Sequence, residues 1–181
     1  IDLASSELAI QTAKKYPIVK ASVGIHPWNA DQYSEEALRR LKELAVDVAV
    51  VAISEIGLDY VGRRDREGKV VNEYVDKQIQ RTAFRKQLRM AKELNFPVLV
   101  HDRAPEQEVL DILEDEGNAK TGAIIHGFSK DIAYAKRCIN TGIYLSIGLR
   151  GITSPGNEAL IEAIRQTPLK WLLTETDSGN P

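Results

Sequence analysis

The chain has 181 residues, of which 43% are hydrophobic and 28% charged, and its 24 basic and 26 acidic side chains give a net charge of −2. This length and composition predict a single domain over residues 1–181 and exclude disordered and collagen-like proteins. The near-neutral charge excludes a broad basic surface for nucleic acid. The single Cys138 excludes a disulfide framework and predicts a cytoplasmic setting. No apolar run is long enough for a membrane helix.

Short strand-like runs alternate with helical patterns along the chain, which is typical of a parallel α/β fold. The candidate folds are therefore a doubly wound open sheet and a (β/α)8 barrel. The sequence has neither a dinucleotide-binding glycine motif nor a Walker A motif, which removes the commonest reasons for an open sheet. Six strands are predicted, each preceded by a helix, at residues 18–23, 48–53, 98–100, 123–125, 143–147 and 171–174.

Capping residues, prolines and glycines predict the helix boundaries. The run at 48–53 is almost wholly apolar, as expected for a strand that is covered on both faces. The long charged connection at 61–71 is expected to be a solvated loop, or alternatively a lid over a catalytic site. The helices are expected to start at Ser5 or Ser6, Ser34, Glu73, Pro105, Ser129 and Glu158, and to end at Tyr16, Leu94, Gly117, Gly142 and Arg165.

Candidate metal ligands lie at the carboxyl ends of the predicted strands. In a parallel barrel these ends converge at one mouth, so residues far apart in the sequence become neighbours there. Imidazoles and carboxylates that meet at one mouth predict a divalent metal site for Zn, Mn or Mg. The residues at these positions are His26, Glu55, Asp59, His101, His126, Glu175 and Asp177.

Most of these residues also have a purely structural interpretation. His26 can cap the turn that follows it, and Asp59 and Asp177 can cap loops. Glu55 is harder to explain in this way, because a carboxylate at the end of an apolar strand is costly without a cation or a strong partner. Arg103, two residues after His101, can pair with a carboxylate or bind an anionic substrate. Two aromatic residues, Trp28 and Tyr60, are candidates for packing at the rim.

Five segments at the strand ends form a series that covers nearly the whole chain. They are Gly24-Ile25-His26-Pro27-Trp28, Ser54-Glu55-Ile56-Gly57-Leu58-Asp59-Tyr60, Pro97-Val98-Leu99-Val100-His101-Asp102-Arg103-Ala104, His126-Gly127-Phe128-Ser129 and Leu173-Thr174-Glu175-Thr176-Asp177-Ser178. In this order they resemble the successive motifs of the TatD family of metal-dependent deoxyribonucleases. The family belongs to the amidohydrolase-like TIM barrels, so the resemblance implies a (β/α)8 fold.

The resemblance also implies an activity. It implies a hydrolase with two divalent ions that cleaves the phosphodiester bonds of DNA, typically from 3′ to 5′, by means of metal-activated water. By motif match, Glu55 would bridge the two ions, with His101 and His126 completing one site. Asp177 would bind the other ion and orient or deprotonate the attacking water. Contact with the substrate phosphate is implied for His26 and Arg103.

The sequence departs from the family pattern in one respect that bears on function. The family opens with a strand that ends in a His-x-His pair, which binds the second ion, and no His-x-His occurs here. Residues 1–3 resemble the end of the family's second strand, so its first two strands and its last helix are expected to lie outside this sequence. We therefore expect an incomplete barrel with open sheet edges, one strong ion site, and weak or no activity.

Two other functions remain open at this point. The first is another hydrolase of the same superfamily that acts on small esters, lactones or amides, because the metal ligands do not determine the substrate class. The second is a non-catalytic module in which the histidines and carboxylates are hydrogen-bonded remnants of a metal site. The second alternative predicts that the melting temperature is indifferent to a chelator.

Overall fold

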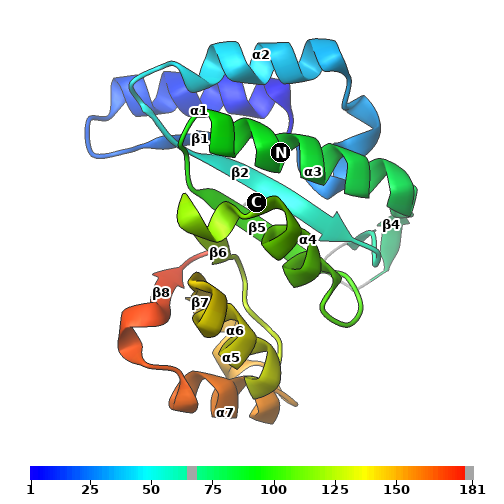
Figure 1. Ribbon diagram of the computed structural model, residues 1–181, viewed down its shortest axis with the longest axis vertical. Helices are drawn as coiled ribbons and strands as arrows, with labels where there is room; N and C mark the ends of the chain where they lie inside the picture. Colours follow the sequence, from blue (N-terminus) through cyan, green and yellow to red (C-terminus); the bar gives the residue numbers. More distant parts are fainter. Residues whose placement is uncertain (65–68, 178–181) are drawn as a thin grey trace.

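The computed structural model describes residues 1–64 and 69–177. Its centre is a curled parallel sheet of six strands in the order β1-β2-β5-β6-β7-β8, with helices on its outer side (Figure 1). Because strand order follows chain order, the sheet grows in one direction, as in part of a barrel, and does not reverse as a doubly wound sheet does. The predicted barrel-type fold is confirmed. The strands are β1 (Ala21–Val23), β2 (Val50–Asp59), β5 (Val98–Arg103), β6 (Ala123–Ile125), β7 (Ile143–Gly148) and β8 (Leu172–Glu175).

The helices cover the outer face of this sheet and enclose the hydrophobic core. The first packs on β1, the third on β2 and the fifth on β7. Within the described residues, no helix has the length and apolar character that crossing a membrane requires. The α-helices are α1 (Leu3–Lys15), α2 (Glu35–Ala45), α3 (Lys77–Glu93), α4 (Glu108–Glu116), α5 (Ile132–Thr141), α6 (Leu149–Thr153) and α7 (Glu158–Gln166), and the 3₁₀ helices are η1 (Pro27–Gln32), η2 (Asn118–Lys120) and η3 (Leu169–Trp171).

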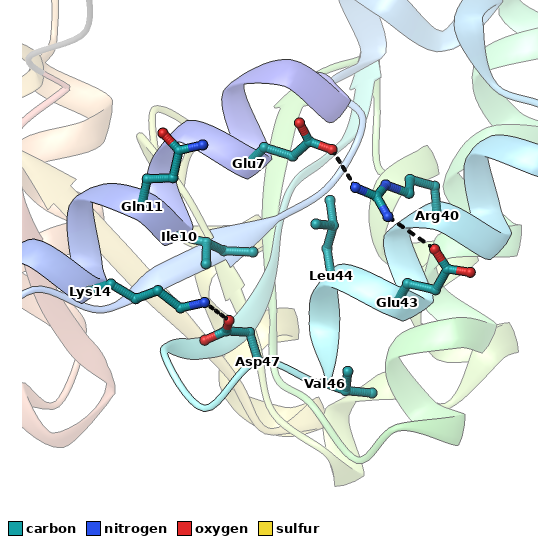
Figure 2. Close-up of a pocket in the computed structure, with 9 residues that line it drawn as sticks. All are labelled: Glu7, Ile10, Gln11, Lys14, Arg40, Glu43, Leu44, Val46 and Asp47. Carbon is teal, nitrogen blue, oxygen red and sulfur yellow. Dashed lines mark hydrogen bonds and ion pairs between the residues drawn. The ribbon is translucent and has the colours of Figure 1, made fainter.

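Two ion pairs connect α1 with α2 and the turn after it (Figure 2). Arg40 lies 2.8 Å from Glu7, and Lys14 lies 2.5 Å from Asp47. A shallow pocket of about 340 Å³ lies between the two pairs. Arg40 also contacts Glu43, so the charged groups that line this pocket neutralise one another. Because these pairs are exposed to solvent, which screens them, they contribute little to the stability of the fold.

Aspartates cap several helices at which other starts were predicted. Asp2 caps α1, because its carboxylate accepts from the backbone N–H of Ser5 at 2.8 Å and the Ser5 hydroxyl accepts from the N–H of Asp2 at 2.9 Å. Asp131 caps α5, where Ser129 was expected, and Asp76 places the start of α3 after Glu73. The start at Pro105 was also wrong, because α4 begins at Glu108. The predictions for Ser34, Gly117, Gly142 and Glu158 are confirmed.

The strand boundaries differ from the predicted ones except at 123–125, and the difference is largest for the second predicted strand. β1 begins at Ala21, and Ile18 is 94% exposed. Val48 lies before β2 and is 93% exposed, and Val51 within β2 is 44% exposed, so the prediction that this strand is covered on both faces was wrong. The reason is that helices cover only the outer face of the curled sheet. β2 also continues beyond Ile53 as far as Asp59, so that Glu55 lies inside the strand.

The charged connection at 61–71 is not wholly irregular. Its ends form an antiparallel hairpin of β3 (Arg63–Arg64) and β4 (Val70–Asn72), next to the carboxyl end of β2 (Figure 1). Residues 65–68, which include the centre of the predicted loop, lie outside the described residues. The guanidinium of Arg63 lies 5.7 Å from the centre of the Trp28 ring.

Candidate metal centre

The strand register brings the candidate residues to one face of the sheet. Gly57 is paired with His101, and Asp59 with Arg103. Residues two apart on a strand point to the same side, so Glu55 and Asp59 share the inner face with His101. The same alternation places His126, which follows β6, and Glu175, the last residue of β8, on this face. The predicted convergence of the strand ends is confirmed by contacts that connect His26, Glu55, Asp59, His101, His126 and Glu175.

Gly57 allows β2 and β5 to approach each other closely. Its φ angle is 143°, and a Cβ atom at this position would lie 2.1 Å from the carbonyl oxygen of His101. No side chain fits at that distance, so the approach of the two strands requires glycine. As a result, Glu55 and Asp59 lie on either side of the His101 ring.

His101 joins two carboxylates. Its Nδ1 lies 3.0 Å from Oε1 of Glu55, and its Nε2 lies 3.0 Å from Oδ2 of Asp59. Asp59 is fully buried, and its Oδ2 also accepts from the indole N–H of Trp28 at 2.7 Å. Its other oxygen accepts from two backbone N–H groups of the following turn at 2.8 and 2.9 Å. Asp59 therefore caps the loop, as the structural interpretation predicted, and also holds His101.

His126 has a similar pair of partners. Its Nδ1 lies 2.6 Å from Oε2 of Glu175, which also accepts from the backbone N–H of Gly127 at 3.1 Å. Its Nε2 lies 3.6 Å from Oε1 of Glu55. His101 and His126 thus each have one nitrogen against a supporting carboxylate and the other toward Glu55. In the neutral tautomer that carries its hydrogen toward the supporting carboxylate, the nitrogen toward Glu55 has a lone pair.

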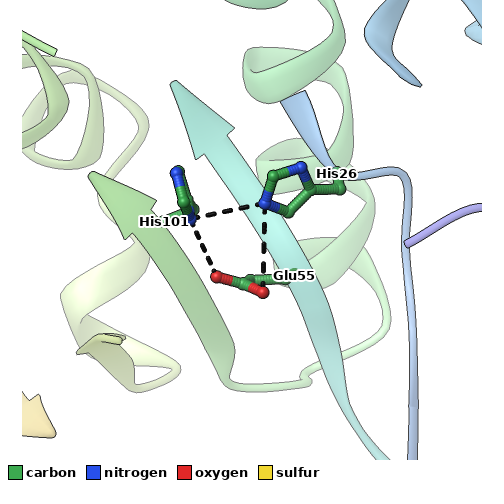
Figure 3. Close-up of side chains that lie close together, drawn as sticks. All are labelled: His26, Glu55 and His101. Atoms are coloured by element: carbon green, nitrogen blue, oxygen red, sulfur yellow. Dashed lines mark hydrogen bonds and ion pairs between the residues drawn. The ribbon is translucent and has the colours of Figure 1, made fainter. Parts of the chain in front are cut away.

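His26, which lies between β1 and η1, approaches the same carboxylate (Figure 3). Its Nε2 lies 3.3 Å from Nδ1 of His101 and 4.0 Å from Oε2 of Glu55. Its Nδ1 accepts from the backbone N–H of Trp28 at 3.1 Å. His26 therefore caps the turn and faces the centre at the same time. Because Nδ1 is an acceptor, the neutral ring carries its hydrogen on Nε2.

The pKa values follow from burial and from these contacts. Burial raises the pKa of Glu55, but the hydrogen bond and charge of His101 outweigh it and lower the pKa to about 2. The same balance lowers the pKa of Asp59 to about 2. Burial lowers the pKa of His101, but its two carboxylate partners raise it above 6.5. Burial and the charge of His101 lower the pKa of His26 to about 3. At neutral pH the two carboxylates are ionised and His26 is neutral.

The donor set suits a divalent cation. In the described ranges, one group of three side chains has all its ligand atoms within 4.8 Å of one another, and it consists of His26, Glu55 and His101. His126 adjoins this group through Glu55. Ligand atoms around a tetrahedral ion lie about 3.3 Å apart, and the nitrogen-to-oxygen distances to Glu55 range from 3.0 to 4.0 Å. Imidazole and carboxylate ligands of this kind suit Zn and Mn.

The two other predicted site residues lie at the edge of this centre. One guanidinium nitrogen of Arg103 is 3.7 Å from Oδ2 of Asp59, and the side chain is 46% exposed. Asp177 is exposed and lines a cavity together with Glu175. Asp59 and Glu175 were among the candidates at the strand ends but had no assigned role, and Trp28 was expected only to pack at the rim. The spacing of two residues between Glu55, Gly57 and Asp59 was the available signal, because it places them on one strand face.

Comparisons with known proteins agree with this architecture. The family described as TatD related DNase matches residues 1–179. The chain belongs to this family. A curated relative from Bacillus subtilis, named as the uncharacterized metal-dependent hydrolase YabD, is 34% identical over 169 residues, which are 93% of this chain and 62% of the relative. The 3′-5′ ssDNA/RNA exonuclease TatD of Escherichia fergusonii is 32% identical over 179 residues, 98% of this chain and 64% of its own length.

A solved structure confirms the TatD fold. The crystal structure of YJJV, a TatD homologue from Escherichia coli K12, has a TM-score of 0.83 to this chain and 27% sequence identity. The match covers 99% of this chain and 69% of that protein. This TatD-family chain spans a little under two thirds of the length of the two curated relatives.

Proposed function

We propose that this TatD-family chain is a divalent-metal-dependent hydrolase that cleaves nucleic-acid phosphodiester bonds from the 3′ end. The observation that carries the proposal is the position of Glu55 between His101 and His126, each of which has a second carboxylate behind it. Such a supporting carboxylate orients a histidine ligand and raises its basicity. The Escherichia fergusonii relative, named as an exonuclease of single-stranded DNA and RNA, supports such a nucleic acid as the substrate.

We assign Glu55, His101 and His126 to a strong ion site and Asp177 to a weaker one, with Zn, Mn or Mg as the ions. A divalent ion supplies Lewis acidity toward a phosphoryl oxygen and toward water. Glu55 stays ionised at all pH values near neutrality, because its pKa is about 2. Asp177, which is exposed beside Glu175, orients the attacking water and accepts its proton.

We assign His26 to the substrate phosphate, although its Nε2 lies among the ligand atoms. The Nδ1 atom accepts from the N–H of Trp28, so that Nε2 carries the hydrogen. A metal ion needs a lone pair, whereas a phosphate oxygen needs a donor. Arg103 is the second donor, because its guanidinium is half-exposed at the edge of the centre.

Two histidines flank Glu55 at the strong site, whereas Asp177 does not belong to the His/Asp/Glu cluster found in the part of the chain that the structure describes. We therefore propose that the 181-residue chain binds one ion tightly and cleaves DNA slowly. The buried free thiol of Cys138 supports a reducing, cytoplasmic setting.

The test uses single-stranded DNA with a 5′ label, incubated with Mn²⁺ or Zn²⁺ in the presence and absence of EDTA. We expect metal-dependent shortening from the 3′ end, its loss in Glu55→Gln, and its retention in Glu158→Gln, a matched change at an exposed position of α7. Equal cleavage by Glu55→Gln and the wild type would contradict the proposal. Turnover of 4-nitrophenyl esters without DNA cleavage would favour the alternative hydrolase of small esters.

A further inference from the structure

A second cavity adjoins the metal centre at the carboxyl ends of β6, β7 and β8. Its volume is about 530 Å³, within the range of small-molecule binding sites. Glu175 lines it, and the carboxylate of Glu175 is also the partner of His126. Gly148 forms another part of the wall, where a Cβ atom would lie 3.3 Å from Oε1 of Glu175. The cavity and the metal centre therefore share one side chain as a wall.

Arg150 lines this cavity and is exposed. Over residues 1–64 and 69–177, no carboxylate forms an ion pair with its guanidinium. Most other arginines in the same ranges are paired with a carboxylate, and Arg63 lies over the Trp28 ring. The paired arginines are Arg39, Arg40, Arg81, Arg85, Arg89, Arg103 and Arg137. A guanidinium without a protein partner in a cavity is a suitable donor to a phosphate.

Hydrogen bonds hold the backbone around Arg150 in place. The carbonyl of Arg150 accepts from the hydroxyl of Ser154 at 2.7 Å and from its backbone N–H at 3.2 Å. The side-chain amide of Asn157 donates to the carbonyl of Gly151. The segment that carries Arg150 is therefore braced before a ligand arrives, which lowers the entropic cost of binding.

The same cavity offers an apolar contact beside this cation. Leu149 lines it and is 71% exposed. A cation and an apolar side chain next to each other match the phosphate and the base of one nucleotide. The carboxylates of Glu175 and Asp177 would repel a phosphate at their own side of the cavity, so Arg150 is the group that receives it.

We infer that this cavity binds the nucleotide on the 5′ side of the scissile bond, with Arg150 contacting its phosphate and Leu149 its base. The inference rests on the proposed function, because it takes the scissile phosphodiester to lie at the metal centre. It assigns Arg150 as a substrate-binding residue that distinguishes a chain of nucleotides from a single phosphodiester.

The test compares TpT, which has one phosphodiester, with TpTpT, which has two, each with fluorescein attached through a 5′-amino group so that the label adds no phosphate. Affinities are measured by fluorescence anisotropy in Zn²⁺. We expect the wild type to bind TpTpT about tenfold more tightly than TpT. The Arg150→Gln variant should lose this ratio while keeping its affinity for TpT, and Arg150→Lys should restore part of it. The matched control is Arg165→Gln, an exposed arginine at the end of α7, which should behave as the wild type.

The outcomes separate the two proposals. An unchanged ratio in Arg150→Gln, or equal weakening of both ligands, overturns the role of Arg150 and leaves the proposed function standing. Failure of the wild type to bind either ligand in a metal-dependent way overturns the proposed function, and this inference with it. Because Arg150 is exposed, we expect its substitutions to leave the melting temperature unchanged.

Discussion

The Oε1 atom of Glu55 lies 3.0 Å from Nδ1 of His101. The two residues belong to neighbouring strands, and the opposite side of the same ring contacts Asp59. Both carboxylates raise the pKa of His101 and so favour a proton on the nitrogen that would face an ion. A metal ion and this proton compete for one lone pair, which links metal affinity to pH.

Asp59→Asn is expected to lower the affinity for Zn²⁺ by about 10- to 100-fold. The amide oxygen of asparagine can still accept from the backbone of the following turn. Its NH₂ group would then face the N–H groups of His101 and Trp28, so His101 could no longer keep its hydrogen on Nε2. Competition with a chromophoric chelator measures the affinity. Asp111→Asn, at a side chain that is 62% exposed on α4, is the control, and an affinity of Asp59→Asn equal to it would contradict this role.

Gly57→Ala is expected to destabilise the protein by at least about 3 kcal/mol. The added Cβ would meet the carbonyl of His101 at 2.1 Å and separate β2 from β5. Gly117→Ala is the matched control, because Gly117 also has a positive φ, of 70°, but its Cβ would meet nothing within 4 Å. We expect this control to cost about 1 kcal/mol. Urea unfolding measures the free energy of unfolding of each variant. Equal losses of stability in the two variants would argue against the close approach of β2 and β5.

Stability in EDTA is expected to fall as the pH is lowered from 6.5 to 4.5. In this window the unfolded chain takes up a proton at His26, whose ordinary pKa is 6.5, whereas the folded protein does not until the pH nears 3. The slope is at most about 1.4 kcal/mol per pH unit. Glu55 and Asp59, whose ordinary pKa values are 4.5 and 3.8, contribute stability that is present above these values and is lost as the pH falls toward 2. His26→Asn, which keeps a capping oxygen, should flatten the slope between 6.5 and 4.5, and an unchanged slope would exclude His26 as its source.

Zn²⁺ is expected to stabilise the folded protein. At about 100 times its Kd, an ion that binds only the native state adds about 2.7 kcal/mol. The melting temperature of the wild type should therefore rise on adding Zn²⁺ and return with EDTA, whereas that of Glu55→Gln should respond weakly. A wild-type melting temperature indifferent to both additions would favour hydrogen-bonded remnants over a metal centre.

Much of the fold could be predicted because its signals are local. Strand and helix alternation gave the parallel sheet, and the strand at 123–125 has the same bounds in the structure. The caps at Asp2 and Asp131 could not be chosen from the sequence, because serines within a few residues are equally good cap formers. The extension of β2 to Asp59 was missed because Glu55 interrupts the apolar run at a point where tertiary contacts, and not hydrophobicity, hold the strand.

The candidate site was predictable as a set of positions but not as a set of contacts. The histidines at strand ends indicated convergence, because parallel strands present their carboxyl ends together. Which nitrogen of each ring faces Glu55 depends on Asp59, Glu175 and the N–H of Trp28, and these contacts arise only from the tertiary structure. The sequence could not distinguish capping from metal binding for His26, since its ring accepts a hydrogen bond from the N–H of Trp28 and also belongs to the cluster of candidate ligands.

The number of divalent ions bound per chain is the most direct test of the metal centre. Protein equilibrated with Zn²⁺ is freed of excess metal and analysed for its elemental content, beside a His101→Ala variant whose fold is checked by circular dichroism. We expect one tightly bound ion per chain in the wild type and its loss in the variant. Equal zinc content in the two proteins, or no bound zinc in the wild type, would contradict a metal centre built on Glu55 and His101.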